Sequence, residues 1–161
     1  MPVFEVNFGA KPSGSGRPLV SPSQVLRLLG PVLTVVISPT SQHLQWLQAN
    51  EKPIPDPISG LALIDTGAAI TAVDEQACNT LGLHATGVVP IAHAGGSSSH
   101  PCYPVHISFP GTPLPSLQNP RVASVKLSVG KQPIILLLGR DLLSKMRVVY
   151  NGPAGRIELA F

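Results

Sequence analysis

The residue whose placement points most directly to chemistry is Asp65, which follows an apolar run. Leu61 to Ile64 reads as a wholly apolar strand, and Thr66 and Gly67 come directly after the aspartate. A carboxylate at the end of a buried strand is costly unless neighbouring groups stabilise it, so this placement favours a functional site. The chemistry that a carboxylate offers in such a place is general acid and base catalysis.

A second motif with charged residues follows another apolar strand later in the chain. Pro133 to Leu138 is followed by Gly139, Arg140 and Asp141, and a short helix through Lys145 is expected next. Between the two apolar strands lies a stretch rich in Gly and Ser, which predicts the tip of a long hairpin. An Asp-Thr-Gly tripeptide alone recurs by chance, but the three features in this order are more specific.

In this order the three segments resemble the retropepsins, the retroviral and retroviral-like members of the clan of pepsin-like aspartic proteases. The resemblance covers about Leu61 to Phe161. It implies an all-β fold, a closed β-barrel or sandwich lobe with one or a few short helices, acting as a homodimer. Residues 61–161 would form the protease core, and residues 1–60 an N-terminal strand with a helical, proline-rich extension packed on the same domain. We also expect Val3 to Phe8 and Ile157 to Phe161 to pair across the dimer interface, because apolar strand edges need cover.

The resemblance also implies a role for each residue of the first motif. Asp65 would be the single catalytic carboxylate of each chain, in an active-site turn completed by Thr66, Gly67 and Ala68. Asp65 and its symmetry mate would share one proton, because two like charges so close together cannot both ionise. The predicted activity is that of an aspartic endopeptidase, a hydrolase that acts on a peptide or protein and needs no cofactor and no metal.

The hairpin between the two motifs corresponds to the family's flap, which covers the substrate. Ala94, Gly95 and Gly96 are the expected tip, because glycines let the backbone fold closely over a bound peptide. Ser97 to Ser99 would make this tip longer and more polar than in typical viral members. A plain mobile loop is the alternative interpretation.

Two departures from the family pattern affect the expected site. Gly139, Arg140 and Asp141 match the family's structural signature, in which the Arg pairs with an Asp two places after the motif glycine. This chain has Ala69 there, so the sequence leaves the partner of Arg140 open. Ala68 stands where pepsin relatives commonly have Ser, whose hydroxyl can donate to the carboxylate. We therefore expect the dyad to hold its proton to higher pH than in pepsin, with activity highest in mildly acidic solution.

Three other interpretations of the sequence are open. A retropepsin fold without activity would act as a peptide-binding or dimerisation module. His93, His100, Cys102 and His106 lie close in sequence and offer metal-ligand chemistry, although they lack a paired ligand spacing. Cys78 lies in a helical pattern without any nucleophile motif, which favours packing over catalysis.

Proline and glycine punctuation predicts a chain of short strands with few helices. Eighteen prolines and fifteen glycines interrupt short runs of Val, Ile and Leu. Strands are expected over Val3–Phe8, Val32–Ser38, Leu61–Ile64, Ile70–Val73, Val88–Ile91, Tyr103–Phe109, Val122–Val129, Pro133–Leu138, Arg147–Tyr150 and Arg156–Phe161. Capping residues and helical spacing predict helices over Pro22–Leu29, over Ser41–Ala49, and from Asp74 to Leu81.

Length and composition limit the partners that the chain is expected to have. A chain of 161 residues has little room for a second lobe, so a two-lobed site must recruit a second chain. Only 12% of the residues are charged and 43% are hydrophobic, and the surplus apolar surface favours a subunit interface. The eleven Lys and Arg are scattered, which predicts no nucleic-acid partner despite the net charge of +3. Without a secretory signal or a bilayer-length apolar run, we expect no membrane partner and favour a cytoplasmic location.

Overall fold

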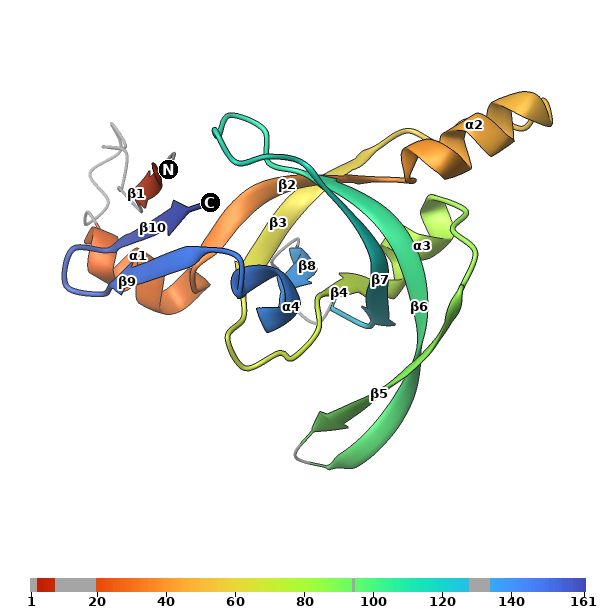
Figure 1. The fold of residues 1–161 in the computed structure, drawn as a ribbon. Coiled ribbons are helices and arrows are strands. Elements are labelled where there is room, and N and C mark those ends of the chain that lie inside the picture. The colour runs from red at the N-terminus through yellow and green to blue at the C-terminus, as the bar shows by residue number, and fades with distance from the viewer. Residues whose placement is uncertain (1–2, 8–19, 94, 128–133) are drawn as a thin grey trace.

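The computed structural model describes residues 3–7, 20–93, 95–127 and 134–161, and most of its elements are strands (Figure 1). The strands are β1 (Val3–Asn7), β2 (Val32–Ser38), β3 (Ile58–Ile64), β4 (Ala72–Asp74), β5 (Gly87–His93), β6 (Gly96–Ser108), β7 (Leu117–Val125), β8 (Ile134–Leu138), β9 (Arg147–Asn151) and β10 (Arg156–Ala160). The helices are α1 (Pro22–Leu29), α2 (Ser41–Ala49), α3 (Glu75–Thr80) and α4 (Arg140–Leu143). Parts of the predicted segments lie outside the described residues, namely Phe8, Ala94, residues 128–129 and Pro133.

The larger sheet closes on itself to form a barrel. Its strands run in the order β2-β3-β8-β4-β7-β6-β5, and β2 also pairs with β6, for example Ile37 with Ile107. Strands β3 and β8 are parallel, as are β4 and β7, whereas the other pairs are antiparallel. Inward-facing side chains fill the barrel because alternate residues of a strand share a face. The all-β fold with a closed barrel and a few short helices, which the resemblance implies, is therefore confirmed. Fully or almost fully buried residues of this core include Val35, Ile37, Ala62, Val105, Ile107, Val122, Leu136 and Leu138.

The first two helices and the strand between them begin and end where the sequence predicts. Ser21 accepts a hydrogen bond from the backbone of Gln24, whose side chain in turn bonds the Ser21 backbone, so the predicted capping box is present. Thr40 caps α2 through the backbone N–H of His43. Asp74 caps α3, as predicted, through the N–H of Gln76. These helices are fixed by local signals, which is why the sequence predicts them well.

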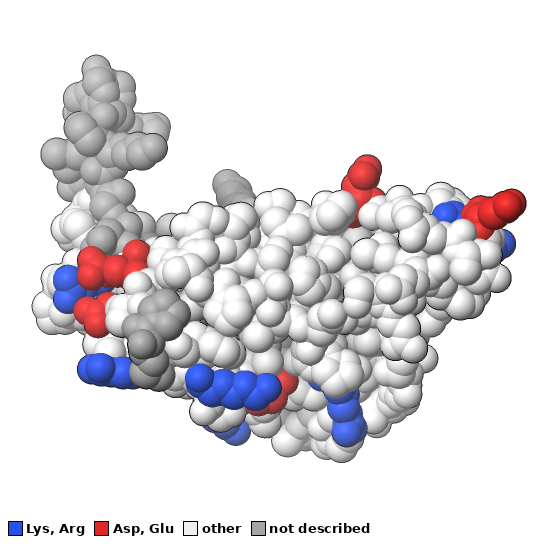
Figure 2. All heavy atoms as spheres, turned by 45° about the horizontal axis from the view of Figure 1, so that its top comes forward, with Lys and Arg blue, Asp and Glu red and all other residues white. Residues whose placement is uncertain are grey.

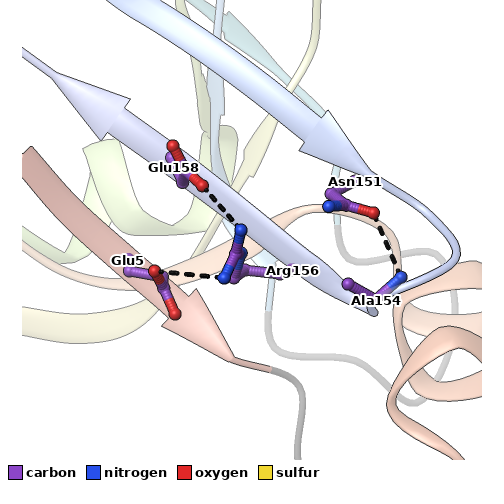
Figure 3. A network of polar contacts seen from close by, with 5 residues as sticks. All are labelled: Glu5, Asn151, Ala154, Arg156 and Glu158. Carbon is purple, nitrogen blue, oxygen red and sulfur yellow. Dashed lines mark hydrogen bonds and ion pairs between the residues drawn. The ribbon is translucent and has the colours of Figure 1, made fainter.

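The two ends of the chain form a small second sheet with the order β1-β10-β9 (Figure 3). Strand β1 pairs with β10 of the same chain in antiparallel register, Val3 opposite Ala160. Arg156 lies between two carboxylates, 3.5 Å from Glu5 and 3.0 Å from Glu158. The two terminal strands thus pair with each other within the single chain, and their pairing across a dimer interface stays a prediction. Strand β10 is paired on both sides, whereas β1 is an edge strand of this sheet among the described residues.

The strands of the long hairpin extend further than the sequence predicts. Ser97, Ser98 and Ser99 belong to β6 and pair with Ala92, Ile91 and Pro90 of β5, so the predicted long polar tip is wrong. Cross-strand pairing explains the difference, because the ladder extends β6 through residues of low intrinsic strand preference.

Strand β7 also begins earlier than predicted. The strand predicted to begin at Val122 begins at Leu117, because Leu117, Gln118 and Asn119 already pair with β6. The ladder between β6 and β7 shifts register between Tyr103 and Val105, where Pro104 lies. A β-bulge is one of the few places in a sheet that accept proline, so prolines mark an irregular ladder here and not the end of a strand.

Much of the surface lacks charged groups. On the face shown in Figure 2, most of the area over the barrel carries neither Lys and Arg nor Asp and Glu. This agrees with the low charged fraction of 12%. Within the described part of the chain, no helix is both long and apolar enough to cross a membrane.

Candidate active site

The turn that carries Asp65 begins where β3 ends. Strands β3 and β8 are parallel and pair up to Ile64 and Leu138, and the backbone N–H of Asp65 continues the ladder by donating to the Leu138 carbonyl at 3.0 Å. The next residues on each strand are Asp65 and Gly139. Because the strands run in the same direction, both predicted motifs leave the barrel side by side.

Two backbone N–H groups hold one oxygen of the Asp65 carboxylate. Oδ1 accepts from Gly67 at 2.9 Å and from Ala68 at 3.2 Å. A Cβ atom at Gly67 would lie 3.1 Å from Oδ1, so glycine lets the turn close around the carboxylate. From the described residues, Oδ2 receives no hydrogen bond. One oxygen is therefore fixed, and the other is available to a water molecule or a second chain.

Arg140 contacts the other side of the same turn. Its Nη1 donates to the carbonyl oxygen of Thr66 at 2.7 Å and to that of Gly67 at 3.2 Å. The backbone N–H of Arg140 donates to the Ala68 carbonyl at 2.9 Å. Because the chain has Ala69 where the family pattern has an aspartate, the sequence left the partner of Arg140 open. These backbone oxygens are its partners in the structure. No residue type marks a backbone acceptor, so the sequence held no signal for this contact.

A buried polar network connects the two motifs beneath the turn. Oδ1 of Asp141 accepts from the backbone N–H of Thr71 at 2.8 Å and from its hydroxyl at 2.7 Å. Asn119 donates to Oδ2 at 3.3 Å, and the N–H of Gly139 donates to the Thr71 hydroxyl at 3.2 Å. Thr71 is fully buried. Sequence reasoning missed Thr71 and Asn119, since only their burial, which depends on the fold, distinguishes them from other polar residues.

A groove of about 500 Å³ runs from the turn to the hairpin strand β5. Its walls come from the turn, from the ends of β7 and β8, and from β5. Asp65 and Arg140 are its ionisable lining residues among those described. The remaining lining residues are Gly67, Ala68, Ala69, Ile70, Ala72, Pro90, Ile91, Ala92, Val125 and Leu137. Apart from Asp65 and Arg140, the described side chains that line the groove are apolar.

The hairpin lies over this groove through its first strand. Pro90, Ile91 and Ala92 of β5 line it, close to the tip formed where His93 pairs with Gly96. Gly96 has φ +125°, a backbone region that favours glycine. Of the expected flap residues, Gly95 and Gly96 are therefore at the tip, and Ala94 lies outside the described residues.

The histidines and cysteines do not form a site in the described part of the chain. No three His, Cys, Asp or Glu side chains gather there as a metal ion would require. His100 bonds the Ser98 hydroxyl and the Ser124 carbonyl, whereas His106 bonds Ser38 on another strand. Burial raises the pKa of the Cys78 thiol to about 11, so it stays protonated at neutral pH. A protonated, buried thiol is a poor nucleophile, which agrees with a packing role.

A second cavity, of about 550 Å³, lies between α2 and strands β6 and β7. His43 stacks on His84 at 5.6 Å between ring centroids, and Trp46 meets both rings edge-on. Burial and then the nearby His84 lower the pKa of His43. The described lining of this cavity includes no carboxylate, and the cavity does not border the Asp65 turn. It is slightly larger than the groove at Asp65, and its ionisable lining residues among those described are His43 and His84.

Comparison with known proteins gives similarity to solved structures. No protein-family model matches the chain, and no curated protein matches it. EIAV protease in complex with the inhibitor HBY-793 is 20% identical, with a TM-score of 0.44 over 71% of this chain and 86% of that one. A retropepsin-like aspartic protease from Rickettsia conorii is 15% identical, with a TM-score of 0.39 over 80% and 91%.

Proposed function

We propose that the chain is an aspartic endopeptidase of the retropepsin type that works as a homodimer. One observation carries the proposal. The Asp65 carboxylate is held by two backbone N–H groups and lines a groove whose other side chains, apart from Arg140, are apolar, with one oxygen left for chemistry. A single such carboxylate cannot act as both acid and base, so a second copy of Asp65 is needed across a two-fold axis.

In the proposed dimer the two carboxylates share one proton, because a second charge nearby makes double ionisation unfavourable. The ionised carboxylate takes a proton from a water molecule held between the pair. The resulting hydroxide attacks the scissile carbonyl carbon, while the protonated carboxyl hydrogen-bonds the developing oxyanion. When the C–N bond then breaks, the leaving amine nitrogen takes a proton from the dyad, which returns to its singly protonated state. Thr66, which is exposed in the single chain, would bond the partner's turn through its hydroxyl.

The lining of the groove indicates the substrate class. Small and apolar side chains, among them Ile70, Ile91 and Leu137, surround Asp65. Arg140, the other ionisable lining residue of the described chain, is engaged with two carbonyl oxygens. We therefore propose extended peptides with apolar side chains on both sides of the cleaved bond as substrates, since a charged side chain would be buried without a partner.

Activity should depend on dimer formation. We expect specific activity toward a peptide library to fall when the protein is diluted through its dissociation constant, because each monomer contributes one carboxylate. Sedimentation velocity at the same concentrations measures the dimer fraction, which should follow the activity. Constant specific activity across a range in which sedimentation shows only monomer would contradict the proposed dimeric site.

Substitution of Ala68 by Ser should move the acidic limb of the pH–rate profile to lower pH. The added hydroxyl can donate to the carboxylate that already accepts from the Ala68 N–H, and a further donor favours the ionised form. The expected shift is about half a pH unit to one unit. Rates on a single peptide, with dimer content checked at each pH, measure it. An unshifted limb in a fully dimeric variant would show that the hydroxyl does not reach the dyad.

A further inference from the structure

We propose that Arg140 is a positioning residue that strengthens the two hydrogen bonds to Asp65 by acting through the peptide groups between them. Arg140 does not touch the carboxylate in the contacts described. Its guanidinium instead binds the carbonyl oxygens of Thr66 and Gly67, while the N–H groups on the same two peptide units donate to Asp65. The role rests on the proposed function, because it concerns the ionised state of the catalytic carboxylate.

The geometry follows from the planar trans peptide. The carbonyl of Thr66 and the N–H of Gly67 belong to one peptide unit and point in opposite directions. The carbonyl of Gly67 and the N–H of Ala68 form the next unit. In both units the oxygen faces Nη1 of Arg140 and the N–H faces Oδ1 of Asp65. The cation and the carboxylate therefore clamp the same two peptide groups from opposite sides.

The charges are arranged so that each contact strengthens the next. A guanidinium at the oxygen end of a peptide dipole draws electron density toward that end, which makes the N–H at the other end a better donor. Better donors favour the ionised carboxylate. Arg140 also restricts rotation of both peptide units, so the N–H groups stay directed at Oδ1.

Few other charges face the turn. Asp65 and Arg140 are the ionisable residues of the described groove lining, and the flanking strand β5 contributes Pro90, Ile91 and Ala92. The carboxylate of Asp141, next to Arg140 on α4, is occupied by Thr71 and Asn119. In the proposed dimer the second Asp65 is the remaining charge. A change at Arg140 therefore alters the principal cation acting on this carboxylate.

The test replaces Arg140 by Met, which keeps the length and removes the charge and donors, and by Lys, which keeps the charge without the planar fork. Amide proton shifts of Gly67 and Ala68 should move upfield in Arg140→Met, because their hydrogen bonds weaken. The acidic limb of the pH–rate profile should move to higher pH, and kcat should fall about tenfold near that limb with little change in KM. Arg140→Lys should lie between wild type and Arg140→Met in both measurements. Arg121→Met, at an exposed position on β7, is the matched control and should change neither.

The two measurements separate this inference from the proposed function. The amide shifts report the clamp even if the protein cleaves no peptide. Unchanged Gly67 and Ala68 shifts in folded Arg140→Met would overturn the inference, as would an equal loss of kcat at every pH with an unmoved acidic limb. If Arg140→Met does not fold, Arg140→Lys decides, since wild-type amide shifts in that variant would also overturn it.

Discussion

Substitution of Asp65 by Asn should leave a folded dimer that no longer hydrolyses peptides. The amide oxygen can still accept from the N–H groups of Gly67 and Ala68, so the turn keeps its shape. An amide cannot take a proton from water at accessible pH, and two amides cannot share the proton that the mechanism needs. We expect kcat to fall by about 10⁴-fold and the free energy of unfolding to change by about 1 kcal/mol or less.

The measurement is cleavage of a peptide library by purified protein, with product masses read directly. Asp56→Asn is the matched control, because Asp56 is an exposed carboxylate in the connector before β3 and the same substitution there should leave kcat unchanged. Sedimentation and circular dichroism must show that Asp65→Asn is dimeric and folded. Peptide cleavage by that variant at the wild-type rate would rule out the catalytic assignment of Asp65.

The bounds of α1 and of the first barrel strand, β2, were predictable because their signals are local. The Ser21 cap with Pro22 and Gln24 predicts where α1 begins, and the β-branched run of Val32 to Ser38 predicts the extent of β2. The apolar strand before Asp65 was equally visible, although β3 begins three residues earlier, at Ile58. Each of these features is encoded within about ten residues, so no knowledge of the fold was needed.

The support of the candidate site was not predictable in the same way. Thr71 and Asp141 lie seventy residues apart in sequence and become neighbours only when β4 pairs with β8. The partners of Arg140 are carbonyl oxygens, which every residue has. The hairpin strands were underestimated because Ser and Pro rank low in strand preference, whereas long-range pairing decides whether they join a ladder.

The close contact between Gly139 and the backbone of Ile70 and Thr71 predicts a large effect on stability. A Cβ atom at Gly139 would lie 2.4 Å from the carbonyl carbon of Ile70 and 2.6 Å from the backbone nitrogen of Thr71. Both are backbone atoms, which cannot rotate away as a side chain would. Gly139 has φ −85° and ψ 173°, which any residue adopts, so the whole cost of an alanine there is steric.

Gly139→Ala should therefore destabilise the chain by about 3 kcal/mol or more, since the start of α4 must move away from the Ile70–Thr71 backbone. That movement also breaks the hydrogen bond from Gly139 to Thr71 and disturbs the two from Thr71 to Asp141. Urea unfolding followed by circular dichroism measures the change, at one fixed protein concentration because dimerisation adds to stability.

Gly87→Ala is the matched control. A Cβ there meets no heavy atom within 4 Å, so its unfolding free energy should stay within about 1 kcal/mol of wild type. Equal urea midpoints for the two variants would show that the two motifs are not packed backbone against backbone.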